Sequence, residues 1–131
     1  MPVNNKNFNN IKIHTQYSIC EGAIKIDDLK EFSKENKIKS LAISDTSNLC
    51  GALEFSEKLS KIGTQPIIGT QINFRYEETI GLLPLFAFNE VGYKRIIELS
   101  SLSYLNNSEL SEPNVPCLLY TSPSPRDSIR S

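Results

Sequence analysis

The chain has 131 residues, of which 39% are apolar and 22% charged, and its formal net charge is −1. This composition is ordinary for one small globular domain, and it lacks the basic stripe that follows a nucleic-acid backbone. No segment resembles a secretory leader or approaches the ~18 apolar residues of a membrane span, so we expect a cytoplasmic protein without membrane contact.

The first predicted elements alternate between strand and helix. The β-branched run Ile11–His14 is typical of a short strand. Residues 25–37 follow with a helical pattern, for which Asp27 is the expected N-cap. The inner face of this helix is expected to carry Ile26, Leu29 and Phe32.

A second strand and a second helix come next. Ser40–Ser44 is an apolar run that ends in the polar turn at residues 45–48. Residues 51–63 then predict a helix that ends at Gly63, the residue type favoured just after a helix. Its apolar residues recur at helical spacing: Ala52, Phe55, Leu59 and Ile62.

The last elements are two strands and a helix. Residues 65–74 predict a strand, and Gly69 within it indicates a bulge or a close backbone approach. Residues 82–88 predict another strand, which Pro84 assigns to an edge or a bulge. Asn89 is the expected cap of a helix that runs to residue 105, with Val91, Ile96 and Leu99 facing inward.

This alternation predicts an α/β fold with a mostly parallel sheet and covering helices. In such folds the chemistry gathers where strands end, and His14, Asp45 and Gln71 fall at or near such ends. The three cysteines lack the short spacing of a zinc ribbon or a disulfide framework. A site built from Cys20, Cys50, His14 and Asp45 is formally conceivable, but small core-like cysteines are the favoured interpretation.

The C-terminal segment changes character abruptly. Residues 117–131 are rich in Ser, Pro and Arg and have no apolar period, which is typical of a disordered linker. Cys117–Asp127 also matches, in one frame, the translation of a transposon-end sequencing adapter. We therefore interpret residues 117–131 as a non-native tail, residues 106–116 as a linker or the start of another element, and residues 1–9 as an N-terminal extension.

Four sequence blocks carry a family resemblance. They read IHTQYSICEGAIKIDDL, LAISDTSNLCGALEF, QPIIGTQINF and FAFNEVGYKRIIELSSLSYL. In order and spacing, over residues 10–105, they resemble the N-terminal PHP (polymerase and histidinol phosphatase) domain of bacterial DNA polymerase III α subunits. The resemblance implies the first half of a distorted (β/α)7 barrel. Its open edge and uncovered core face lead us to expect aggregation and poor solubility of the chain alone.

Active members of this family hold divalent metals on His, Asp and Glu side chains and hydrolyse phosphoesters. By resemblance, His14, Glu21 and Asp45 keep a ligand type, so they are the candidate vestigial metal positions. At the remaining positions the family's ligands are replaced by Lys12, Thr46, Gln71 and about Leu82. Asp45 before Thr-Ser-Asn also suits a purely structural turn, and His14 a hydrogen-bonded strand end.

Lys12 is the replacement with the largest electrostatic consequence. An ammonium about 4 Å from a divalent ion is repelled by about 8 kcal/mol at an effective dielectric constant of about 20. We therefore expect no functional metal site, no catalytic residue and no bound cofactor in this chain. As a hypothesis, the Lys12 ammonium takes the place of the metal and neutralises Asp45 and Glu21.

The function implied by the resemblance is that of a structural part of a replicative DNA polymerase. The parent chain would synthesise DNA with Mg²⁺ in its own polymerase domain and would bind primer-template DNA there. The PHP domain would act as a scaffold and as a docking platform for the proofreading exonuclease. The alternative is an active metal-dependent PHP phosphoesterase or proofreading nuclease that works with a reduced ligand set.

Overall fold

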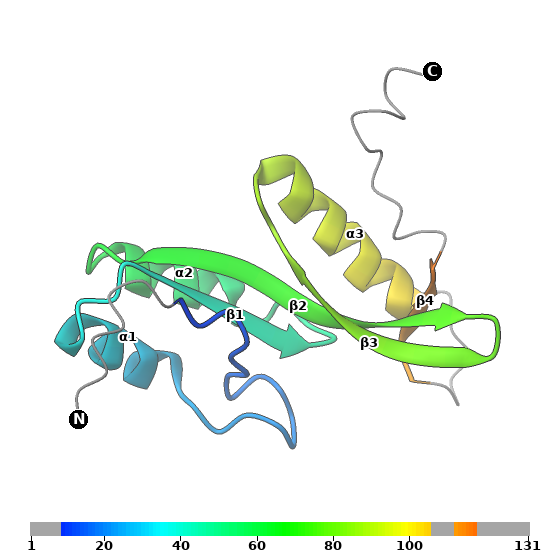
Figure 1. The fold of residues 1–131 in the computed structure, drawn as a ribbon, viewed down its shortest axis with the longest axis horizontal. Coiled ribbons are helices and arrows are strands. Elements are labelled where there is room, and N and C mark those ends of the chain that lie inside the picture. Colours follow the sequence, from blue (N-terminus) through cyan, green and yellow to red (C-terminus); the bar gives the residue numbers. More distant parts are fainter. Residues whose placement is uncertain (1–8, 106–111, 118–131) are drawn as a thin grey trace.

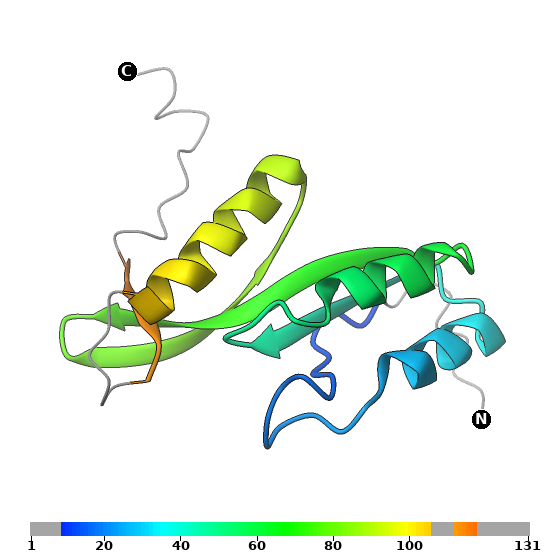
Figure 2. The ribbon, with the colours of Figure 1, turned by 180° about the vertical axis from the view of Figure 1, so that it is seen from behind.

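The computed structural model describes residues 9–105 and 112–117. The elements in chain order are α1 (Ile26–Glu35), β1 (Ser40–Thr46), α2 (Ala52–Ser60), β2 (Gln65–Tyr76), β3 (Thr79–Phe86), α3 (Glu90–Leu105) and β4 (Asn114–Pro116). The long strand β2 joins two ends of the molecule: α1, α2 and β1 lie at one end, and α3 and β4 at the other (Figure 1, and from behind in Figure 2). The predictions for residues 1–8, 106–111 and 118–131 lie outside the described residues.

The α/β class is confirmed, and the sheet is mixed rather than mostly parallel. β1 and β4 run parallel to β2, whereas β3 runs antiparallel to it. β3 follows β2 directly because the chain turns back at Glu77, which has a left-handed φ of 53°. β3 pairs with β2 alone among the described strands, so the edge position that Pro84 indicated is confirmed.

The strand predicted at Ile11–His14 is wrong. This segment runs beside β1 and makes two backbone hydrogen bonds to it, from the Ala42 and Ser44 amides to Asn10 and Ile13. The ladder stops there because the Thr15 amide donates to the Asp45 carboxylate and not to a strand carbonyl. The segment therefore shields the edge of β1 without forming a strand of its own.

Helix α1 differs in detail from its prediction. Its N-cap is Lys25, which makes no side-chain capping bond, so the expected cap at Asp27 is wrong. Asp27 lies instead in the first turn, where a carboxylate offsets the positive end of the helix dipole. Phe32 is 52% exposed, and the buried position on that face belongs to Ser33.

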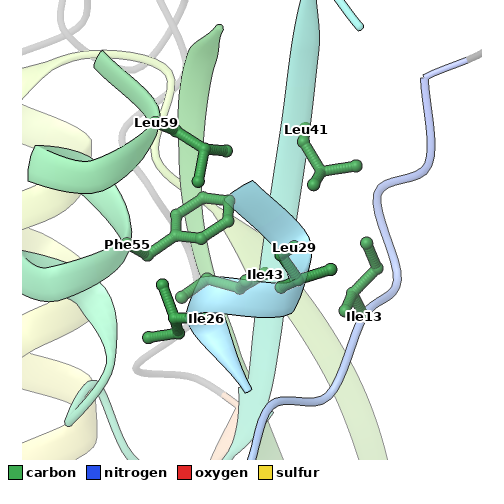
Figure 3. Packing of buried hydrophobic residues seen from close by; sticks show 7 residues of the cluster. All are labelled: Ile13, Ile26, Leu29, Leu41, Ile43, Phe55 and Leu59. Atoms are coloured by element: carbon green, nitrogen blue, oxygen red, sulfur yellow. The ribbon is translucent and has the colours of Figure 1, made fainter. Parts of the chain in front are cut away.

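The first hydrophobic core lies between the helices α1 and α2 and the strand β1 (Figure 3). Phe55 and Leu59 of α2 are fully buried in it, as their spacing predicted. Ile62 is half-buried, and Gly63 has the left-handed φ of 79°, two residues after the C-cap Lys61. The complete cluster is Ile13, Ile26, Leu29, Leu41, Ile43, Phe55 and Leu59.

A second, smaller core lies at the other end of β2. It consists of Ile72, Phe74, Leu99 and Val115. Ile96 and Leu99 of α3 are buried as predicted, whereas Val91 is 75% exposed, which corrects its inward assignment.

Two local predictions around β3 and α3 are confirmed. The Oδ1 of Asn89 accepts a hydrogen bond of 2.9 Å from the amide of Gly92, so Asn89 caps α3. A Cβ on Gly69 would lie 2.5 Å from the Phe86 ring and 2.7 Å from the Leu85 carbonyl. Gly69 therefore permits the close approach of β3 to β2.

Candidate functional site at the ends of β1 and β2

The end of β1 presents consecutive polar side chains to opposite faces of the sheet. Asp45 alternates with Leu41 and Ile43, so it points to the face that carries α1, α2 and the first core. Thr46 points to the other face, where the register places it beside Gln71 of β2. The candidate ligands are thus divided between two faces.

Asp45 is 1% exposed and binds the loop that follows His14. Its Oδ1 accepts hydrogen bonds from the Thr15 amide (2.6 Å) and the Ser18 hydroxyl (2.8 Å). Its Oδ2 accepts one from the Thr15 hydroxyl (2.7 Å). Ser18 also accepts the Thr46 amide at 3.0 Å. Both carboxylate oxygens are therefore engaged in fixing residues 15–18 onto β1.

The opposite face carries His14, Glu21, Thr46 and Gln71, which we call the strand-end cluster. The Gln71 side-chain nitrogen lies 3.1 Å from His14 Nε2 and donates to Thr46 Oγ1 at 3.3 Å. The Thr46 hydroxyl donates to Glu21 Oε2. Glu21 Oε2 also lies 3.9 Å from His14 Nδ1. The four side chains thus form a row of polar contacts whose two ends, His14 and Glu21, lie 3.9 Å apart.

His14 contributes one engaged and one unengaged ring nitrogen to this cluster. If the Gln71 amide donates to Nε2, as it is placed, Nδ1 carries the proton of a neutral imidazole. Nδ1 is buried and makes no hydrogen bond among the described residues, because 3.9 Å to Glu21 exceeds hydrogen-bond distance. A small movement of Glu21, which is 45% exposed, would bring the two groups together.

Lys12 does not have the role that the sequence suggested. It is exposed, and among the described residues it forms no ion pair with Asp45 or Glu21. The hypothesis that its ammonium neutralises both carboxylates is therefore wrong in this structure. Asp45 is already stabilised by three donors and points to the other face of the sheet.

The remaining candidates lie apart from the cluster. Leu82 is 45% exposed on β3 and shares the sheet face of Gln71, since Pro84, two residues along, is the register partner of Gln71. Cys20 and Cys50 are exposed free thiols, so they are not core residues. Across residues 9–105 and 112–117, no group of three or more His, Cys, Asp or Glu side chains could hold a metal ion.

The cluster does not fit a divalent metal centre by itself. Such a centre takes three or four converging nitrogen, sulfur or carboxylate ligands. The cluster offers one imidazole and one carboxylate, while Thr46 and Gln71 are neutral and already hydrogen-bonded to each other. Asp45 cannot complete the set without losing its own bonds.

Sequence reasoning missed Thr15, Ser18 and Tyr17. Thr15 and Ser18 carry hydroxyl groups one and four positions after His14. Such groups can donate hydrogen bonds to a buried carboxylate. The Tyr17 hydroxyl donates to Glu54 at 2.8 Å, and this hydrogen bond raises the pKa of Tyr17. It joins the loop to α2.

Glu54 continues this contact into an ion-pair network on the helices. Lys58 lies 2.7 Å from Glu54 and 2.6 Å from Asp27. The hydrogen bonds to Lys58 lower the pKa values of Asp27 and Glu54, and both carboxylates raise the pKa of Lys58. The network fastens α1, α2 and the loop together on the solvent side.

The elements and their pairing define an α/β domain with a mixed sheet. A solved structure from Bifidobacterium adolescentis, described as a metal-dependent phosphoesterase, superimposes with a TM-score of 0.53 at 20% identity. The match covers 75% of this chain and 35% of that one. At this identity it shows the fold alone.

Comparison of the sequence with known families and relatives identifies the family of this chain. The model of the PHP domain matches residues 10–124, so the chain belongs to the PHP domain family. The DNA polymerase III subunit alpha of Caulobacter vibrioides is 39% identical over 83% of this chain, and that of Helicobacter pylori is 36% identical over 77%. The chain spans about a tenth of the length of these relatives. In the described part of the chain, no helix is long and apolar enough to cross a bilayer.

Proposed function

We propose that this chain is the N-terminal part of a replicative DNA polymerase III α subunit and acts there as a structural PHP domain. The observation that carries the proposal is the 39% identity to the Caulobacter vibrioides subunit over 83% of the chain. Synthesis of DNA would occur elsewhere in the parent chain, on Mg²⁺ and primer-template DNA held by its polymerase domain. The protein would work in the cytoplasm.

The proposed role is structural because the metal site is degenerate. Support comes from the strand-end cluster, in which Thr46 and Gln71 are neutral and hydrogen-bonded to each other. By the family resemblance, both stand at ligand positions. Asp45, the third ligand-type residue, is engaged on the other side of the sheet. No catalytic residue is therefore proposed within the chain.

We further propose that the sheet continues into a (β/α)7 barrel in the parent. The face opposite the helices supports this, because Ile80 and Leu82 of β3 lie 48% and 45% exposed on it. Further strands would enclose this face as the interior of the barrel. The completed barrel would brace the polymerase domain and offer a docking platform to the proofreading exonuclease.

A binding experiment tests the degenerate site. Titration calorimetry with Mn²⁺ and Zn²⁺ should show no specific binding to the wild-type chain. The variant Lys12→His/Thr46→His/Gln71→Glu restores the ligand types that the family resemblance implies at these positions and should bind Mn²⁺. The matched variant Asn48→His places an imidazole on the neighbouring loop and should not. Stoichiometric binding by the wild type would refute the degenerate site.

The parentage has its own test. In the source genome, the reading frame around residues 10–116 should continue into a polymerase domain with paired catalytic aspartates. The complete subunit should then form a complex with the purified exonuclease, and deletion of residues 10–105 should abolish it. A stop codon shortly after residue 116, or a complex that survives the deletion, would contradict the proposal.

One observation favours the alternative of an active phosphoesterase. Among the described residues, His14 Nδ1 is buried without a hydrogen bond and lies 3.9 Å from Glu21 Oε2. With the ring proton on Nε2 instead, Nδ1 and this carboxylate would both face a metal or a water. In that case the chain should release phosphate from a generic ester in the presence of Mn²⁺, and His14→Ala should abolish the release. Background turnover in both proteins would exclude this alternative.

A further inference from the structure

Lysines are concentrated where helices α1 and α2 end and the chain turns into the sheet. We call this group the lysine patch, and its members are Lys34, Lys37, Lys39 and Lys61. All four residues are exposed. Residues 34–39 and 61–65 contain these four lysines and one carboxylate, Glu35, so the two segments carry a net charge of +3. Because the whole chain carries −1, its remaining residues carry −4.

Hydrogen bonds hold the two turns of the lysine patch side by side. The Lys39 carbonyl accepts the Gln65 amide at 2.8 Å, and the Ile38 carbonyl accepts the Thr64 hydroxyl at 2.9 Å. The carboxyl-terminal ends of α1 and α2 accordingly lie at the same end of the molecule (Figures 1 and 2). The fold thus brings Lys61 to residues 34–39, although the lysines do not form one stripe in the sequence.

The lysine patch is separate from the strand-end cluster. The two turns lead into the first residues of the parallel strands β1 and β2, whereas the cluster lies where β1 ends at Thr46. At about 3.3 Å per residue, the two ends of β1 are about 20 Å apart. Both turns lie within complete helix–strand units, so their exposure does not depend on where the sheet ends.

In the described part of the chain, no ion pair joins a lysine of the patch to a carboxylate. By contrast, Lys58 and Lys94 each pair with a glutamate four residues earlier. A lysine near the end of a helix offsets the negative end of the helix dipole, which accounts for Lys34 and Lys61. Lys37 and Lys39 lie beyond α1, so the dipole does not account for them. Their charge remains available to an anionic partner.

The composition of the patch favours a phosphate backbone over a protein surface as this partner. Protein interfaces have an apolar centre, are enriched in aromatic residues and are depleted in lysine. Residues 34–39 and 61–65 contain no aromatic residue, and Ile38 packs against the first core. Lysines without an apolar anchor suit the sequence-independent contacts by which proteins bind nucleic-acid phosphates.

We propose that the lysine patch binds the phosphate backbone of double-stranded nucleic acid without recognising its bases. The choice of nucleic acid rests in part on the proposed function, because a chain joined to a DNA polymerase domain lies close to primer-template DNA. The patch adds a phosphate contact outside the polymerase domain. Its four ammonium groups act through charge alone, so the affinity depends steeply on salt.

Fluorescence anisotropy of a labelled DNA duplex with the 131-residue chain tests the proposal. Each neutralised phosphate contributes about −0.9 to the slope of log K against log salt, so four contacts predict a slope of about −3.6 between about 25 and 200 mM NaCl. Lys37→Gln/Lys39→Gln should weaken binding about tenfold or more at about 50 mM NaCl and should bring the slope to about −1.8. The matched variant Lys25→Gln/Lys94→Gln removes the same charge outside the patch and should change the affinity by less than about twofold. Circular dichroism should show that both variants stay folded.

Competing ligands test the choice of partner. A second duplex of unrelated sequence should bind with an affinity within about twofold of the first, because phosphate contacts carry no sequence information. Tighter binding of poly-L-glutamate than of the duplex would assign the patch to an acidic protein and overturn the proposal. Absence of duplex binding at the lowest salt, or an equal loss in both double variants, would also overturn it. Such a failure would leave the proposed parentage intact, since the reading frame tests that separately.

Discussion

Removal of the Asp45 carboxylate is the sharpest test of how the site loop is held. Asp45→Ala would leave the Thr15 amide and the Thr15 and Ser18 hydroxyls without their acceptor in a buried position. A hydrogen bond to a charged group contributes about 1.5–3 kcal/mol, and such contributions are not additive. We therefore expect the free energy of unfolding to fall by about 4 kcal/mol, a large share of the ~5–15 kcal/mol of a typical domain.

The assay is urea denaturation followed by far-UV circular dichroism, since the chain has no tryptophan. It is performed at one fixed protein concentration because association would shift the midpoint. Asp45→Asn keeps the shape and one acceptor oxygen, which can still take the Thr15 amide and the Ser18 hydroxyl, but its NH2 group cannot accept from the Thr15 hydroxyl. It should cost about 1–2 kcal/mol, so it provides a test if the alanine variant does not fold. Glu21→Ala removes a half-exposed carboxylate and should cost less than about 1 kcal/mol. An Asp45→Ala variant within about 1 kcal/mol of wild type would refute the reasoning.

Three further predictions concern other contacts. Asp27 and Glu54 have lowered pKa values, so their contribution is present above their unfolded values of 3.8 and 4.5 and is lost as the pH falls through the lower folded values. The urea midpoint should therefore drop below about pH 4.5, and Lys58→Met should flatten that drop; an unchanged slope would contradict the network. Gly69→Ala should cost about 1–3 kcal/mol through its clash with Phe86 and Leu85, whereas Gly81→Ala, with open space around it, should not; equal costs would disprove the close-approach argument. Tyr104→Phe removes the 2.6 Å bond from its hydroxyl to the Ser47 carbonyl and should cost about 0.5–1.5 kcal/mol while speeding hydrogen exchange of the Ser47 amide; unchanged exchange would show that α3 does not hold this loop.

The parts of the fold that could be predicted are those governed by local pattern. The spacing of Phe55 and Leu59 indicated α2 and its buried face, and Asn89 indicated where α3 begins. Gly69 indicated a close backbone approach, although its partner Phe86 could not be identified from the local sequence. Each of these signals depends only on residues that are close in sequence, so it can be recognised without knowledge of the tertiary structure.

The failures share a different cause, because each depends on a partner distant in sequence. The segment at residues 11–14 has strand-like residues, but Asp45, some thirty positions later, takes the Thr15 amide out of the ladder. The family resemblance suggested that the Lys12 ammonium lies beside Asp45 in place of a metal. In the structure, alternation along β1 turns Asp45 to the face opposite the strand-end cluster. Val91 fits a helical stripe, yet the core at that end of β2 is too small to reach it. Strand direction and sheet face, not residue type, decide these cases.

Strand β2 contributes to both hydrophobic cores, so the two ends of the molecule can open separately. Its first half pairs with β1 beside α2, its second half pairs with β4 beside α3, and at Gly69–Gln71 it has neighbours on both sides. Either end of the sheet could open while the other end stays packed against its helices. Complete separation of the two ends would require the pairing at Gly69–Gln71 to break as well. The middle of β2 thus joins the two halves of the molecule: either half can open locally, and both remain connected through Gly69–Gln71.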